Sequence, residues 1–201
     1  DNKIWMATLS GLFVYDTKTG GTERYRQDPV NPNGLNNETL YRLFPDKTGA
    51  FWIGTLGGGL NKFNRNKKKF RHYRNDPGNP NSITSNTVRA IFLENEETLW
   101  ISMPHAGVNK INRKTGNVEV LRNNGAGSIG DDFVTLIKKD SKGNLWFGTW
   151  SSGVSVMDKS GKFEYIRNIP GDDNSLMNNL VQAFYEDQFG NIWLGTENGI
   201  S

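Results

Sequence analysis

The sequence predicts an all-β fold built from a repeated unit, and two observations support this prediction. Short apolar runs alternate with turns rich in Gly, Asn, Asp and Pro, and no stretch has the apolar periodicity of a helix. Five tryptophans also recur with spacings of 47, 48, 46 and 47 residues: Trp5, Trp52, Trp100, Trp146 and Trp193. A fixed period of this length indicates a repeat protein in which each unit forms one small sheet.

Other positions keep the same register around each tryptophan and define the strands of the unit. An aliphatic residue precedes the tryptophan by twelve positions, an acidic residue precedes it by six, and a glycine follows it by six or seven. The acidic residues are Asp46, Glu94, Asp140 and Asp187. The pattern predicts four strands per unit, typified by residues 88–93, 145–149, 153–158 and 163–167.

Four antiparallel strands in a unit of this length are typical of a β-propeller blade. We expect a partial blade at 1–34, full blades at 35–81, 82–127 and 128–174, and a partial blade at 175–201. The recurring tryptophan would fill the space between adjacent blades. Because cut blades leave unpaired strand edges, the chain is predicted to be a propeller fragment completed by the rest of its parent or by another copy of itself.

Composition excludes several classes of site. The chain has no cysteine, only two histidines and no cluster with the spacing of metal ligands, so neither a metal nor a cofactor is expected. The glycines at 57–59 lie between strands with no helix after them, unlike a phosphate-binding loop. No apolar run approaches the roughly 20 residues of a membrane span. The start at Asp1, without a basic and apolar leader, predicts a processed form or an excised fragment.

The repeat also resembles a known family. Residues 38–60, 86–100, 132–154 and 179–199 carry a pattern similar to the two-component regulator propeller repeat, and residues 73–83 resemble the linker between such repeats. The resemblance implies a periplasmic sensor region of a hybrid two-component system, anchored in the inner membrane. Such sensors detect oligosaccharides and signal through a membrane helix to a histidine kinase, so kinase activity would lie outside this segment. The third repeat departs from the family, because Ser102-Met103-Pro104 replaces Gly-Thr and Glu97 replaces the turn glycine.

Ligand-binding candidates are the loop residues that differ between repeats. Trp150 offers an apolar face that suits stacking on a sugar ring, and His105 offers a switchable donor or acceptor. The alternative is that Trp150 packs on a neighbouring blade and that His105 is merely solvated. Near the channel, each of four further residues would either meet a polar ligand or face water: Tyr41, Arg89, Asp131 and Asp132.

Other charged positions favour structural roles. The basic run at 62–74 is interpreted as protection of an exposed strand edge, and on this interpretation no nucleic acid partner is expected. The alternative is a patch that binds acidic polysaccharide or nucleic acid. An arginine closes the fourth strand and is predicted to bond carbonyls of the following connector. These arginines are Arg26, Arg74, Arg122 and Arg167.

Catalysis finds little support in the sequence. The carboxylates that would suit a glycosidase are Asp131 or Asp132 with Glu38, and these are ordinary polar positions, since Asn86 and Asn179 replace them in other repeats. We therefore expect a non-catalytic sensor that binds an oligosaccharide and makes no membrane contact within this segment. Two alternatives stay open: a hydrolase or lyase acting on polysaccharide, and a protein-interaction propeller of a surface or secretion assembly.

Overall fold

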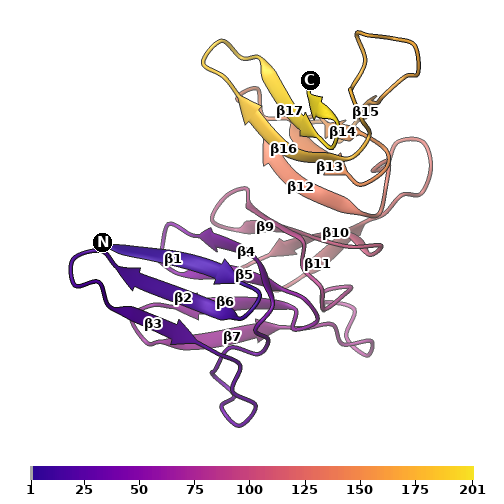
Figure 1. Cartoon of the computed structure of the whole chain (residues 1–201). Coiled ribbons are helices and arrows are strands. Elements are labelled where there is room, and N and C mark those ends of the chain that lie inside the picture. The colour runs from indigo at the N-terminus through magenta and orange to yellow at the C-terminus, as the bar shows by residue number, and fades with distance from the viewer. Residues whose placement is uncertain (1) are drawn as a thin grey trace. The chain divides into compact units, whose positions relative to one another are not determined.

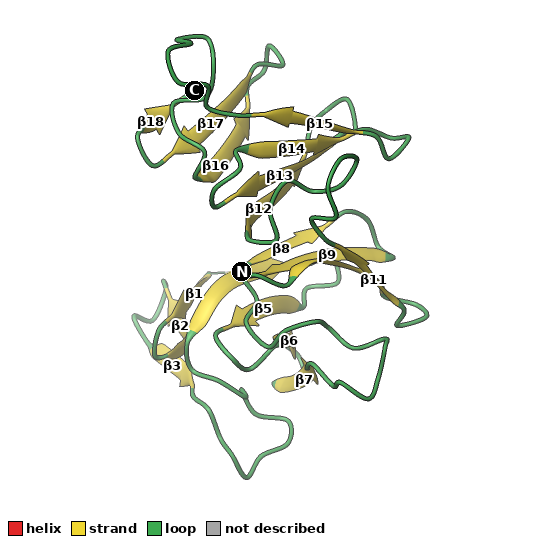
Figure 2. Ribbon diagram, turned by 90° about the vertical axis from the view of Figure 1, so that its right-hand side faces the viewer, coloured by secondary structure: helices red, strands yellow, loops and turns green. Residues whose placement is uncertain are grey.

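The chain is all-β, as predicted. The computed structural model describes residues 2–201, and within this range it contains strands β1 to β18 and no helix. The strands form five antiparallel sheets of three or four strands each (Figure 2). The residues divide into two compact units, the first ending at Ile91 and the second beginning at Phe92.

The first unit holds two sheets (Figure 1). One has the order β1-β2-β3, with β1 at Lys3–Thr8, β2 at Gly11–Asp16 and β3 at Thr22–Tyr25. The other has the order β4-β5-β6-β7, with bounds of Leu40–Pro45, Phe51–Thr55, Leu60–Asn64 and Lys69–Tyr73.

The other sheets have the orders β11-β10-β9-β8, β12-β13-β14-β15 and β16-β17-β18. The unit boundary falls inside β8 (Ala90–Leu93), which is followed by β9 (Thr98–Met103), β10 (Gly107–Asn112) and β11 (Val118–Leu121). The next sheet has bounds of Val134–Lys139, Leu145–Thr149, Val154–Met157 and Phe163–Ile166. The last three strands are Val181–Glu186, Ile192–Thr196 and Gly199–Ile200. The three sheets of four strands agree with the predicted four strands per full repeat. The predicted blade limits, which fall within the connectors, stay a prediction.

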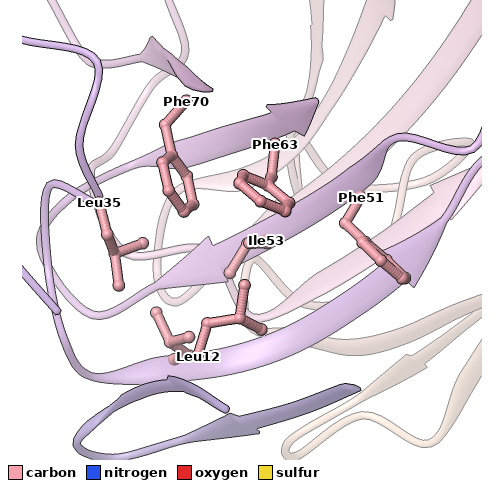
Figure 3. Packing of buried hydrophobic residues seen from close by; sticks show 7 residues of the cluster. Leu12, Leu35, Phe51, Ile53, Phe63 and Phe70 are labelled. Carbon is pink, nitrogen blue, oxygen red and sulfur yellow. The ribbon is translucent and has the colours of Figure 1, made fainter. Parts of the chain in front are cut away.

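Apolar side chains join neighbouring sheets within each unit. In the first unit, Leu12 of β2 packs with residues of the second sheet and its connector, as Figure 3 shows. That cluster consists of Leu12, Leu35, Leu40, Phe51, Ile53, Phe63 and Phe70. The Trp5 ring lies 4.8 Å from the ring of Phe51 across these sheets. In the second unit, Trp146 lies 5.4 Å from Phe184 of the following sheet. These tryptophans fill the space between sheets, as predicted, whereas Trp193 on the last sheet is 49% exposed.

The recurring acidic residue proves to be the hydrogen-bond partner of the tryptophan. The indole Nε1–H donates to the carboxylate six positions earlier at 3.2 Å in Trp52, 2.8 Å in Trp100, 2.9 Å in Trp146 and 3.1 Å in Trp193. A buried indole N–H needs such an acceptor because leaving it unpaired costs free energy. Within residues 2–201, the Nε1 of Trp5 is buried and has no partner.

The recurring glycine after the tryptophan links one repeat to the next. Gly153 has a φ of +70°, and a Cβ there would lie 2.2 Å from the carbonyl oxygen of Ile166. Its N–H donates to the carbonyl of Asn179 in the following repeat at 2.9 Å. Only glycine combines this backbone conformation with so close an approach. The same bond between repeats is made by Gly59 to Asn86 at 2.7 Å and by Gly107 to Asp132 at 3.0 Å.

Candidate functional site

Three rings form a continuous aromatic surface in the second unit. Trp150, which is 45% exposed, stacks on Phe133 with ring centroids 4.9 Å apart and an angle of 12° between the planes. The edge of His105 meets the same phenylalanine at 5.1 Å and 69°. We call His105, Phe133 and Trp150 the aromatic platform. Trp150 therefore packs on a residue of its own repeat instead of on a neighbouring blade, and it stays half exposed.

The backbone places Trp150 directly opposite Phe133. The N–H of Trp150 donates to the carbonyl of Phe133 at 2.9 Å, which extends the pairing of β12 with β13 by one step. Leu56 with Thr39 and Glu197 with Leu180 make the same bond in other repeats, at 2.9 and 3.1 Å. The scaffold therefore fixes the backbone here and leaves the identity of the two side chains free.

Asp131 fastens the loop that carries Trp150. Its Oδ1 accepts the N–H of Phe133 at 2.8 Å, and its Oδ2 accepts the N–H and the Oγ–H of Ser151 at 3.0 and 2.7 Å. The first bond belongs to the repeat, since the side chains of Asn37, Ser85 and Asn178 accept the corresponding N–H groups at 2.8, 3.2 and 2.7 Å. The bonds to Ser151 need the second carboxylate oxygen, so Asp131 holds the platform in place.

Asp132 also makes a bond that the repeats share. Its Oδ1 accepts the N–H of Asn123 at 2.8 Å, and its Oδ2 lies 3.3 Å from Nη1 of Arg122. At the same position, Glu38, Asn86 and Asn179 accept the N–H of Gln27, Asn75 and Asn168 at 3.3, 2.8 and 2.8 Å. Both carboxylates of the platform region are thus occupied by the chain itself.

The third repeat forms its turn differently because of its departures from the pattern. Pro104 has no N–H, so it cannot donate the bond that Trp150 and its counterparts donate. Met103 replaces a threonine whose hydroxyl, in Thr149, donates to the carbonyl of Gly153 at 2.8 Å. His105 takes a φ of 56°, which is uncommon for a residue with a side chain, and Nη1 of Arg122 donates to its carbonyl at 3.1 Å. Backbone strain of this kind is concentrated at functional sites.

Two of the four recurring arginines, Arg26 and Arg122, pair differently from the prediction. Nη1 of Arg122 reaches the carbonyl of the preceding turn and the side chain of Asp132, instead of carbonyls of the connector. Arg26 likewise lies 3.6 Å from the carboxylate of Glu38. The arginine and the acidic residue of the connector therefore form an ion pair in the two repeats where that residue is acidic.

Tyr41 and Arg89 lie in the first unit and form a pair of their own. The guanidinium of Arg89 lies 5.6 Å from the centroid of the Tyr41 ring, a cation–π contact. Both side chains are half-buried.

Phe133 and Ser151 were missed as site residues in the sequence. A signal was present, because Phe133 stands 13 positions before its tryptophan, where Thr39, Thr87 and Leu180 stand in other repeats. An aromatic residue there faces the position four after the tryptophan across the two strands, which is the position of Trp150.

The described residues contain neither a metal-binding cluster nor a membrane-spanning helix. Residues 2–201 hold no group of three or more His, Cys, Asp or Glu side chains that could bind a metal ion. They also contain no helix long and apolar enough to cross a membrane.

Comparison with known proteins identifies the repeat. The family model described as two component regulator propeller matches residues 128–151 and 175–198. These segments are similar to the two-component regulator propeller repeat. The first matched segment carries Asp131, Phe133 and Trp150, so two of the three platform rings lie within a repeat that the family model recognises. No curated protein sequence matches the chain.

Solved structures show the same fold at low sequence identity. Two crystal structures of the extracellular domain of BT4673 from B. thetaiotaomicron, one described as a one-component and the other as a hybrid two-component system, match with TM-scores of 0.79 and 0.78. The identities are 23% and 22%, over 100% of this chain and 25% of that one. The extracellular domain of BT3049 from the same organism, assigned to a hybrid two-component system, matches at 0.61 and 23% over 100% of this chain and 31% of that one.

PorZ, a surface component of the type-IX secretion system of Porphyromonas gingivalis, matches with a TM-score of 0.54 and 13% identity, over 99% of this chain and 36% of that one. The chain thus spans between a quarter and about a third of these structures. Together with the repeat match, the comparisons identify the fold as a segment of a β-propeller.

Proposed function

We propose that the chain is a non-catalytic, ligand-sensing part of an extracytoplasmic sensor in a hybrid two-component system, and that the aromatic platform binds an oligosaccharide. The observation that carries this proposal is Trp150, stacked at 4.9 Å on Phe133 and still 45% exposed. A ring held in this way offers an apolar face at low entropic cost, because it is already ordered before a ligand arrives. Sugar rings present C–H faces that suit such a surface, and their hydroxyls need polar groups at its edge.

Polar groups flank the platform on the same loops. The imidazole of His105 is exposed beside Phe133 and can donate or accept a hydrogen bond. Ser151, fastened by Asp131, is exposed next to Trp150. The combination of a flat apolar surface with a few fixed polar groups is typical of small-molecule sites.

The parent protein would supply the other parts of the sensor. We infer that the remainder of the propeller completes the scaffold, and that ligand occupancy is passed across the inner membrane to a histidine kinase outside this segment. The family match and the likeness to extracellular domains of hybrid two-component systems support a periplasmic position for this segment.

The alternative of a polysaccharide-acting enzyme loses its best carboxylates. The carboxylate of Asp131 accepts hydrogen bonds from the N–H groups of Phe133 and Ser151. The carboxylate of Asp132 accepts the N–H of Asn123 and pairs with Arg122. Glu38 accepts the N–H of Gln27. A general acid or base has to exchange its proton with the substrate, whereas these carboxylates are committed to the loops. The alternative of a surface or secretion assembly draws on the structural likeness to PorZ alone.

Titration of the 201-residue chain with a panel of neutral oligosaccharides, followed by calorimetry, tests the proposal. We expect saturable binding that Trp150→Ala weakens by about 5- to 150-fold, if stacking contributes the roughly 1–3 kcal/mol that it contributes per base on aromatic side chains of nucleic-acid-binding proteins. Phe189→Ala is the matched control, because Phe189 is an 80% exposed aromatic residue of the same unit that lies outside the platform. Equal affinity of Trp150→Ala and the unmodified chain, or no binding across the panel, would refute the proposed role of the platform.

A further inference from the structure

Two arginines of the first unit carry positive charge that the chain does not neutralise. Within residues 2–201, no ion pair joins Arg42 or Arg89 to a carboxylate. We propose that Tyr41, Arg42 and Arg89 form a binding site for an oxyanion, the carboxylate or sulfate group of an acidic saccharide. The saccharide part of this assignment rests on the proposed function, whereas the oxyanion part rests on the geometry alone.

A β-bulge directs the side chains of this site. The register of β4 against β5 shifts between Leu40 and Arg42, so Tyr41 is the extra residue. Shifts at the corresponding position recur between Val134 and Leu136 and between Val181 and Ala183. Bulges redirect a side chain and are frequent beside functional sites. Arg89 occupies the same position of the next repeat, eleven residues before its tryptophan, as Tyr41 does before Trp52.

The guanidinium of Arg89 contacts an aromatic ring, but one of its N–H donors has no acceptor within residues 2–201. The guanidinium of Arg89 lies over the Tyr41 ring, 5.6 Å from its centroid. The Nε of Arg89 is inaccessible to solvent and has no hydrogen-bond partner. A buried, unpaired donor on a charged group costs free energy, so the site would gain more than a solvated arginine by accepting an anion.

A second cation lies close by. Among residues 2–201, the Arg42 side chain donates to a neutral group, the carbonyl of Tyr41, at 3.1 Å. Partial burial and the charge of Arg89 together lower the pKa of Arg42. Like charges that lie near each other without a counter-ion are stabilised by a bound anion.

The chemistry of these residues selects the class of ligand. A guanidinium presents parallel N–H donors that match the two oxygens of a carboxylate or of a sulfate. The phenol of Tyr41 adds a ring face and a hydroxyl. The basic hairpin around Lys68 differs, because Lys68 is paired with Glu23 at 2.8 Å.

Binding of sodium glucuronate, sodium sulfate and neutral glucose to the isotope-labelled chain tests this site. We expect saturable shifts of the Arg89 Nε–H resonance with glucuronate, sulfate or both, and none with glucose. Arg89→Gln should weaken binding at least about tenfold, and Arg89→Lys should weaken it too, since lysine keeps the charge without the fork. Arg71→Gln is the matched control, because Arg71 also lies over a tyrosine ring in this unit, 5.2 Å from that of Tyr73.

The outcomes separate this site from the platform. Shifts with only one of the two anions would define the oxyanion as carboxylate or as sulfate. No saturable shift with either anion, or equal weakening by Arg71→Gln and Arg89→Gln, would overturn the site. The two proposals can fail separately. If a neutral oligosaccharide binds and only Trp150→Ala abolishes its binding, the proposed function is supported even when the anion site fails the tests above.

Discussion

Replacing Asp140 by alanine tests whether the acidic residue of each repeat exists to serve its tryptophan. The Asp140 side chain is buried and accepts three hydrogen bonds: from Nε1 of Trp146 at 2.9 Å, and from the backbone N–H and the side-chain amide of Asn144 at 2.7 and 2.8 Å. Alanine removes all three, and the indole N–H of a tryptophan that is only 9% exposed is left without an acceptor.

The expected loss in the free energy of unfolding is about 3 kcal/mol. A hydrogen bond to a charged group contributes about 1.5–3 kcal/mol, and the bond to Trp146 should reach this range because solvent cannot replace it. The bonds to Asn144 add about 1 kcal/mol, since that residue lies in a turn where water can substitute in part. A loss of this size lowers the melting temperature by about 6–12 °C in a chain of this length.

Urea unfolding followed by far-ultraviolet circular dichroism measures the effect, and Asp158→Ala is the matched control. Asp158 closes the same kind of turn, with the N–H of Gly161 bonded to its carbonyl as that of Gly143 is to Asp140, but it is exposed and bonds no indole. Its replacement should cost clearly less. Trp146→Phe in combination with Asp140→Ala should show a coupling of about 1 kcal/mol or more. Equal losses for the two aspartates, or no coupling, would refute this account.

Acid should destabilise the fold through the same carboxylates. Hydrogen bonds from Asn191 and Trp193 lower the pKa of Asp187 to about 2, and the pKa values of the three equivalent residues are lowered too. The stability that these ionised carboxylates contribute is therefore complete above about pH 4–5 and is lost as the pH falls toward about 2. Acid titration followed by circular dichroism measures this loss. Gly153→Ala should lower the free energy of unfolding in urea by at least about 3 kcal/mol, and Gly161→Ala by only about 1–2 kcal/mol. Both glycines have a positive φ, but of the two only Gly153 has a carbonyl oxygen 2.2 Å from the added Cβ. Equal losses would contradict this explanation. Phe133→Leu should shift the indole N–H resonance of Trp150 while leaving those of the other tryptophans in place.

The fold was predictable because its determinants recur. Strand, turn and glycine positions return at a period of 46–48 residues, so each repeat tests the interpretation of the others. The strand limits differ from the prediction by one or two residues, as in β8, which begins at Ala90 where a strand from 88 was expected. The partner of the acidic residue could not be predicted, since only the turn geometry shows that a carboxylate six positions earlier reaches the indole Nε1.

The candidate site was predictable only in part. Trp150 and His105 stand out because they break the repeat, but their common neighbour Phe133 was missed, since its role depends on pairing across strands. Asp131 and Asp132 were expected to meet either a polar ligand or water, and the structure shows their oxygens bonded to the chain. A side chain that binds its own backbone and one that awaits a ligand look alike in sequence, and only the hydrogen-bond partners distinguish them.

A backbone hydrogen bond shared by three repeats shows how the surface at this position varies while the fold is kept. At the position four after the tryptophan, Leu56, Trp150 and Glu197 all donate the same backbone bond to the residue 13 before it. The bond uses no side chain, so any residue except proline keeps it at the donor position, and Pro104 of the third repeat cannot make it. Phe133 with Trp150 forms a stacked pair, whereas Thr39 with Leu56 and Leu180 with Glu197 offer different surfaces at the same place. Because the bond recurs and the side chains vary, this pair of positions can offer a different surface in each of these repeats while the strand pairing is kept.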